Sequence, residues 1–214
     1  MSYDTSVGVA YYISQTFASA KTLSIVSNAD PALATSTSHG YTDNDEVLYV
    51  GGWERASNGV FKVDQQSTDT FLIKGLNSTS TSLYTAGAGV GTTQKISSWI
   101  EIPQILAVNP EGGTARYIDV RPVKLLQGFK LNDGFDPASI SWDIGFDPSL
   151  SDWATLLDIS RLQTYGAYKR VKGTKATYGY GLFSISEQPQ DASGQVTIVR
   201  ATFAAQGPLI SYAS

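Results

Sequence analysis

The residue types that carry acid–base or nucleophilic chemistry are sparse in this chain. His39 is the single histidine, and there is no cysteine among the 214 residues. A serine–histidine–aspartate triad is arithmetically possible, but no nucleophile elbow or oriented base accompanies His39, and its neighbours are typical of a turn. The lack of cysteine excludes disulfides, zinc–thiolate sites and cysteine nucleophiles. The sequence therefore predicts no catalytic residue and favours a protein that is not an enzyme.

Two short patterns match ligand sites only in part. Three acidic residues between positions 43 and 46 could hold calcium, but their spacing lacks the glycine and the distal glutamate of an EF-hand loop. The glycines between 87 and 91 are spaced like a phosphate loop, yet no Lys-Ser or Lys-Thr pair follows them and no helix begins there. We expect a solvated turn and a flexible loop, with no metal and no cofactor.

Four cations lie close together, at Lys169, Arg170, Lys172 and Lys175. They could contact DNA phosphates, but two strands that meet at a solvated turn around Gly173 would also collect lysines. The net charge of −4 gives no global basic surface of the kind that nucleic-acid-binding proteins show. We favour the hairpin turn, where the lysines could serve subunit contacts.

The composition is that of a folded protein with few surface charges. Hydrophobic residues make up 42% of the chain and aromatic residues 11%, which argues against disorder. Charged residues make up only 16%, well below the usual quarter. No stretch has the pattern of a secretory signal or a membrane span, so we expect a soluble product that is made in a cytoplasm. A chain with so few surface charges either has unusually polar neutral surfaces or hides much of its surface against partners, and the second alternative points to an assembly.

One long helix is predicted, over about 149–164. Apolar residues at spacings of three to five form a single stripe there. Pro148 and a serine N-cap would begin the helix, and Gly166 would end it. Such a helix needs an apolar sheet face to cover. Its predicted core residues are Leu150, Trp153 and Leu157.

Strand patterns dominate the rest of the chain. Between 139 and 146, apolar residues alternate with small or polar ones, which predicts a half-buried strand. From 23 to 96, short strands separated by Asn, Asp, Gly and Thr clusters indicate a small all-β unit, and residues 77–93 have the composition of an exposed loop. Residues 121–133 carry apolar side chains without a period, which indicates a projecting loop or a β-arm. The predicted class is mostly β, with one helix packed on a sheet.

The order of these segments resembles proteins of phage tails. Residues 27–47 and 59–63 resemble a small β module common in phage tail proteins, in which Ala-His-Gly and Gly-Asp-x-Val run into Asn-Gly-x-Phe-x-Val. The module usually has a glycine before its aspartate, where this chain has Asn44 before Asp45.

A second resemblance lies behind the module. Residues 99–105 and the segment 147–150 with the helix after it resemble the tail tube proteins of long-tailed bacteriophages. Together the two resemblances span about 14–203.

This resemblance implies two packed antiparallel sheets with one flanking helix and an inserted small β module. Residues 1–22 and 97–214 would form the tube sandwich, and 23–96 an outward-facing module. Six copies would close a ring by continuing the inner sheet, and stacked rings would form a hollow virion tail for genome passage. The implied partners are other copies, tail terminator and baseplate or tip proteins, the tape measure protein and double-stranded DNA held non-specifically, with no membrane. The alternative is a phage accessory or surface-binding module, which binds a receptor or decorates a particle.

Two sets of candidate residues follow from the tube hypothesis. DNA must slide without sticking, so the lumen should be neutral or negative. The lumen candidates are Asp119, Asp143 and Glu187. The apolar residues of the 121–133 segment would become ordered against the next ring. These ring-stacking candidates are Val123, Leu125, Leu126, Phe129 and Leu131.

Overall fold

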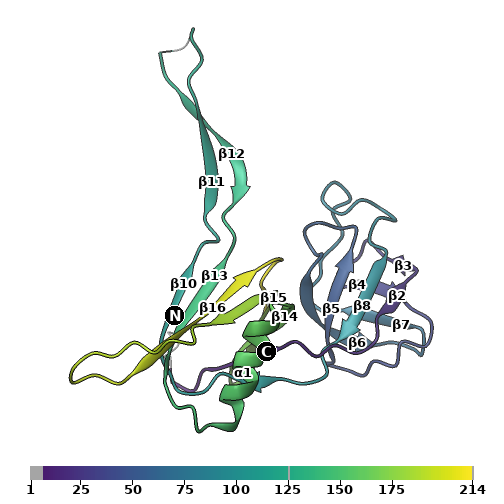
Figure 1. The fold of residues 1–214 in the computed structure, drawn as a ribbon. Coiled ribbons are helices and arrows are strands. Elements are labelled where there is room, and N and C mark those ends of the chain that lie inside the picture. The colour runs from purple at the N-terminus through teal and green to yellow at the C-terminus, as the bar shows by residue number, and fades with distance from the viewer. Residues whose placement is uncertain (1–6, 125, 214) are drawn as a thin grey trace.

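A computed structural model describes residues 7–124 and 126–213 of the chain. Strands dominate these residues, and a single helix accompanies them, so the mostly-β prediction is confirmed. The strands form an eight-stranded sheet, a seven-stranded sheet and a two-stranded ribbon, all antiparallel (Figure 1). Leu125, one of the predicted stacking residues, lies outside the described residues.

The eight-stranded sheet combines the start of the chain with its second half. Its order is β10-β13-β16-β15-β14-β1-β9, and β17 also pairs with β15. Because β1 pairs with β14, the sheet joins the start of the chain to strands that lie far later in the sequence, and the seven-stranded unit is formed by residues between them. Its strands are β1 (Ala10–Ser14), β9 (Ile100–Glu101), β10 (Ile105–Glu111), β13 (Ser139–Gly145), β14 (Tyr165–Lys172), β15 (Lys175–Ile185), β16 (Ile198–Ala205) and β17 (Ile210–Tyr212).

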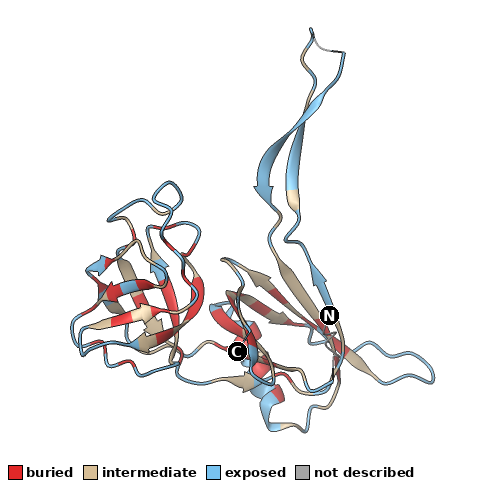
Figure 2. Cartoon of the chain, turned by 180° about the vertical axis from the view of Figure 1, so that it is seen from behind, coloured by how far each residue is buried: buried red, intermediate tan, exposed pale blue. Residues whose placement is uncertain are grey.

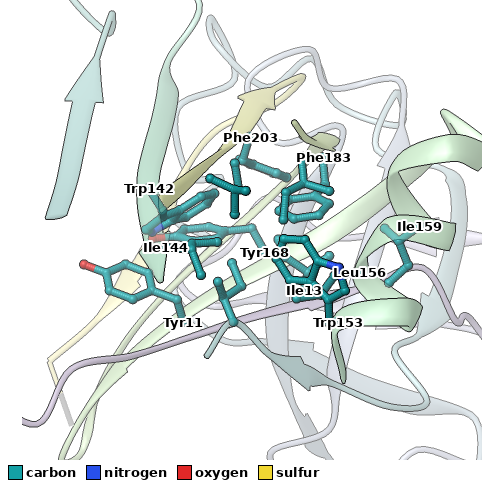
Figure 3. Close-up of a cluster of buried hydrophobic side chains, with 14 residues drawn as sticks. Tyr11, Ile13, Trp142, Ile144, Trp153, Leu156, Ile159, Tyr168, Phe183 and Phe203 are labelled. Atoms are coloured by element: carbon teal, nitrogen blue, oxygen red, sulfur yellow. The ribbon is translucent and has the colours of Figure 1, made fainter. Parts of the chain in front are cut away.

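An aromatic core covers one face of this sheet. The predicted alternation in β13 buries Trp142 and Ile144 completely. Tyr168 stacks on Phe203 with ring centroids 5.1 Å apart and lies 5.8 Å from Trp142. These rings come from three different strands and meet at the centre of the cluster (Figure 3). The large apolar area that they remove from water is the main stabilising contribution to this half of the chain.

Helix α1 (Ser151–Leu162) covers the remaining side of that core. Trp153 is buried, while Leu150 and Leu157 are only partly buried against the cluster. The prediction missed Leu156 and Ile159, which are buried one turn apart on the same face. The helix is also the only one among the described residues, and it is not long enough to cross a membrane.

Both helix ends differ from the prediction. The N-cap is Leu150, whose apolar side chain cannot cap the helix, and the amide and hydroxyl of Ser149 instead donate hydrogen bonds to the Asp147 carboxylate. The helix ends at Gln163, which adopts the left-handed conformation with φ of 49°. Gly166 lies beyond it in β14, where a Cβ atom would stand 2.5 Å from the carbonyl oxygen of Ser14. That glycine therefore allows two strands to approach and does not cap the helix.

The seven-stranded sheet folds on its own core. Its order is β2-β8-β5-β6-β7-β4-β3, so its two ends are adjacent in the sequence. Trp53 and Tyr49 are buried in its interior with Phe61 and Phe71. Its strands are β2 (Lys21–Leu23), β3 (Ile25–Val26), β4 (Ala32–Thr35), β5 (Glu46–Gly51), β6 (Gly59–Gln65), β7 (Thr70–Ile73) and β8 (Gly91–Lys95).

The segment 77–93 is not a simple exposed loop. Ser78 is fully buried, and its hydroxyl hydrogen-bonds to the backbone of Ser27 and Ala29. The ring of Tyr84 packs edge-on against Trp53, with centroids 5.3 Å apart. Small hydroxylated residues favour this outcome because they satisfy backbone groups where no strand passes.

The ribbon of β11 (Ala115–Val120) and β12 (Phe129–Phe135) projects from the body as a long arm (Figure 1). It continues the hairpin of β10 and β13, but neither of its strands pairs with another sheet. Of the segment predicted as a loop or a β-arm, residues 129–133 belong to β12, while 121–124 and 126–128 lie outside the strands at the tip of the ribbon. An isolated two-stranded hairpin is marginally stable in water, so the arm needs a partner.

We expect Trp153→Ala to destabilise the fold by about 3–5 kcal/mol, because it leaves a large cavity between the helix and the sheet. The ring of Phe146 also loses its edge-on contact, with centroids 5.4 Å apart. Chemical denaturation measures the loss. Leu162→Ala, at a side chain that is 65% exposed on the same helix, is the matched control and should cost less than about 0.5 kcal/mol. Equal losses of stability in the two variants would show that Trp153 does not lie on the buried face of the helix.

Candidate assembly surfaces

The projecting ribbon has two chemically different faces. Cross-strand partners share a face, so Ile118 opposite Leu131 and Val120 opposite Phe129 form one apolar face. The side chains of Ile118, Leu131 and Phe129 are 51%, 50% and 47% exposed. Figure 2 shows the ribbon as exposed along most of its length. Monomeric proteins rarely leave a contiguous apolar strip of this kind exposed to water.

The other face of the ribbon is polar. Asp119 lies opposite Lys130, and their charged groups are 3.9 Å apart. The Lys130 ammonium also lies 5.8 Å from the ring centre of Tyr117, which shares that face. Sequence reasoning found the exposed residues Val123, Leu126, Phe129 and Leu131 but missed Ile118. Apolar and polar residues alternate in the sequence of 116–120. Only the cross-strand register, however, shows which residues of the two strands share the apolar face of the ribbon.

A second exposed surface is the polar face of the eight-stranded sheet. Opposite the buried face of β13, a row of small polar side chains runs across four strands, from Asn109 through Ser141 and Thr202 to Ser184. The next row pairs Asp143 with Arg200, whose Nε lies 3.1 Å from the carboxylate. The row of neutral hydroxyls and this ion pair make the surface polar with little net charge.

The three lumen candidates do not lie together. Asp143 is on the polar sheet face, where Arg200 balances its charge. Asp119 is on the ribbon, in a strand that does not pair with the eight-stranded sheet. Glu187 follows the end of β15 and pairs at 2.7 Å with Arg161 of the helix, on the opposite side of the sheet. This contact lowers the pKa of the Glu187 carboxyl, through a hydrogen bond and the positive charge.

A charged cluster joins the two sheets. One carboxylate oxygen of Glu46 accepts hydrogen bonds from the Lys169 ammonium at 2.7 Å and the Tyr178 hydroxyl at 2.6 Å. The other accepts from the indole N–H of Trp99 at 2.6 Å. The Lys169 ammonium also lies 5.2 Å from the ring centre of Trp99. Burial, together with the bond to Glu46, raises the pKa of the Tyr178 hydroxyl.

Apolar residues surround this cluster. Leu48, Val60 and Ile96 of the seven-stranded unit pack against Ala176 and Tyr178 of β15. From here on, we call this contact and the charged cluster the joint. The C-terminal strand strengthens it, because the Tyr212 hydroxyl accepts from the Lys62 amide and donates to the Lys74 carbonyl oxygen. The two sheets are therefore packed together and not merely tethered.

The joint corrects the interpretation of the basic group. The hairpin turn predicted around Gly173 is present, since β14 and β15 pair up to Lys172 and Lys175 and Gly173 has a φ of 57°. Lys169, however, lies outside the solvated turn. Its side chain is only 21% exposed and its partner Glu46 belongs to the same chain. No periodicity in the sequence could link two residues that far apart.

The other chemically suggestive residues have structural roles. His39 is buried, with Nδ1 accepting from the Tyr41 amide and Nε2 against the Ser67 carbonyl oxygen. Asp45 pairs with Lys95 at 2.7 Å. Asn44 takes the left-handed conformation, with φ of 66°, which asparagine tolerates in place of the module's usual glycine. Across 7–124 and 126–213, no three potential metal ligands cluster.

The chain is similar to known proteins of viral tails and related particles. The family model described as "Phage tail tube protein, TTP" matches residues 51–214. A chain from the tail of an empty gene transfer agent particle with C6 symmetry aligns at 16% identity and a TM-score of 0.42, covering 55% of this chain and 88% of that one. A chain from the virion of a native gene transfer agent aligns at 18% identity and 0.40, covering 54% and 89%. No curated protein matches significantly.

We expect Glu46→Gln to lower the free energy of unfolding by about 1–3 kcal/mol, because a largely buried Lys169 loses its counter-charge. Chemical denaturation measures this, and hydrogen exchange in β5 and β15 should locate the loss at the joint. Asp119→Asn removes one partner of an exposed pair, with side chains 66% and 70% exposed, and should cost less than about 1 kcal/mol. A Glu46→Gln protein as stable as Asp119→Asn would show that the cluster contributes nothing.

Proposed function

Given that the chain belongs to the phage tail tube protein family and is a structural subunit of a tail tube, we propose that its copies close hexameric rings that stack into a channel for genome passage. The observation that carries this proposal is the uncovered apolar face of the ribbon. A marginal hairpin with one apolar face persists only when another surface covers it. In a self-assembling tube, that surface belongs to another copy.

The edges of the eight-stranded sheet support ring closure. β10 lies at one end of the sheet order and the two-residue strand β9 at the other. A free edge presents unpaired backbone groups that invite pairing with another chain, and Leu106 on β10 is 57% exposed. Pairing between copies would satisfy these edges and continue the sheet around the ring. The number six comes from the resemblance to tail tube proteins of long-tailed phages.

We place the polar face of the sheet in the channel. Hydroxyl groups and a neutralised ion pair offer DNA no array of cations, so the phosphates are not held in place. Asp143 is the one predicted lumen residue on this face, and it makes the surface neutral together with Arg200. The seven-stranded unit covers another part of the same sheet face, farther along β15 at the joint, and we place it on the outside of the tube.

A subunit of a tail tube would also have partners other than its own copies. We propose that the tube contacts a tail terminator protein at one end and baseplate or tip proteins at the other. The tape measure protein and double-stranded DNA would occupy the channel in turn, both without specific contacts. The subunit would be made in the host cytoplasm and would work in the virion tail.

We expect Leu126→Asp and Phe129→Asp each to give a folded protein that does not polymerise, because each would bury an unpaired charge at the contact. Sedimentation velocity and electron microscopy measure assembly, and circular dichroism checks the fold. Tyr117→Asp adds the same charge on the polar face of the same ribbon and should still form tubes. Normal tubes from both apolar-side variants would remove the ribbon from the contact between copies.

We expect the double substitution Ser141→Lys with Thr202→Lys to leave tubes intact but make their channels retain DNA. The added cations would bind phosphate, with a strong dependence on salt. Short duplex DNA is mixed with assembled tubes, and the protected fraction is measured after nuclease treatment. Ser80→Lys, on the exposed surface of the seven-stranded unit, should bind DNA that stays sensitive to nuclease. Nuclease-sensitive DNA on the double variant would exclude this face from the channel.

A further inference from the structure

A β-bulge near the base of the ribbon reverses the side on which the side chains of β12 point. Up to Asn132 the two strands pair regularly, but Ala115 then pairs with Phe135, so β12 holds one extra residue. Gly134, with φ of 92°, lies in this bulge. Since one extra residue reverses the side on which later residues point, Phe135 lies on the side opposite Leu131. It is 69% exposed there.

A groove of about 1290 Å³ lies beside Phe135. Its walls come from three separate parts of the chain: the base of the ribbon, the turn at 51–58 and the loop at 205–209. Leu209, which also lines it, is 39% exposed. The groove is thus partly apolar, and it also holds two acidic residues and one basic residue, namely Glu54, Asp136 and Arg55.

One copy cannot fill its own groove with its own apolar ribbon face. The face that holds Ile118 and Leu131 points away from the side that holds Phe135, because the bulge separates them. Because the apolar face and the groove lie on opposite sides of the ribbon, a contact between them would join two copies head to tail. Each copy would offer the ribbon to one neighbour and the groove to another.

Charge and length agree with this pairing. The ribbon tip carries Arg121 and Lys124, and no acidic residue occurs from Val120 to Phe129. The groove has one more acidic than basic residue among those that line it. At about 3.3 Å per residue, the eleven residues from Gly113 to Val123 extend on the order of 30 Å. The ribbon therefore reaches well beyond the body of its own copy.

We propose that the apolar face and basic tip of the ribbon of one copy dock in the groove at the ribbon base of the next copy. This inference rests on the proposed tube function and names the surface that receives the arm. Phe135 and Leu209 cover the apolar face, while Glu54 and Asp136 face the cations of the tip.

Site-directed crosslinking tests the proposal directly, because the chain has no cysteine of its own. Leu131→Cys with Leu209→Cys places one thiol on the ribbon face and one at the groove. A short bismaleimide added to assembled tubes should produce a ladder of covalent oligomers on denaturing gels. Each single-cysteine variant can give at most dimers. Leu131→Cys with Val196→Cys, at the separate hollow of about 620 Å³ beside β10, is the matched comparison and should give no ladder.

A charge exchange gives a second readout. Lys124→Glu and Glu54→Lys should each raise the concentration needed for assembly about ten-fold, and the double variant should restore the parental value. Intact tubes without a ladder from the 131/209 pair, or with a ladder from the 131/196 pair, would overturn the groove assignment and leave the tube function standing. Failure of the unaltered chain to assemble at all would overturn the proposed function itself, and the docking with it.

Discussion

The eight-stranded sheet must hide apolar surface on both of its faces, and the arrangement of the rest of the chain depends on this. The cluster around Trp142 and Tyr168 lies on one face, where α1 covers it. Ala176 and Tyr178 lie on the other face, where the seven-stranded unit covers them. Only the part of the sheet centred on Ser141 and Thr202 needs no cover, because its side chains are polar. That remaining surface is the one that can face water.

Because part of the sheet face is apolar, the seven-stranded unit must be packed firmly on it. Its removal would expose the apolar side of β15 and leave Lys169 without Glu46. The Tyr212 hydroxyl would also lose both of its backbone partners. A partly buried ion pair contributes little net free energy on its own but is costly to break. The cluster therefore fixes how the unit sits on the sheet, while the surrounding apolar contacts hold it there.

Local patterns in the sequence predicted the elements, and long-range pairing decided what they do. The alternation around Trp142 and the single helix were visible as periodicity. The register of the ribbon was not, so Ile118 was missed. Gly166 looked like a helix stop, but it serves a close approach to Ser14. Glu46 looked like part of a solvated acidic turn, because its three partners lie 53 to 132 residues away. Contacts between such distant residues leave no trace in local spacing.

The central claim is that this chain builds a hollow tube through surfaces that a single copy leaves uncovered. Electron microscopy of the purified chain, carried to a helical reconstruction, tests it most directly. The account predicts stacked rings with the Ser141 and Thr202 face on the inner wall and each ribbon buried against another copy. A folded protein that stays monomeric at assembly concentrations, or a tube whose wall turns that polar face outward, would contradict it.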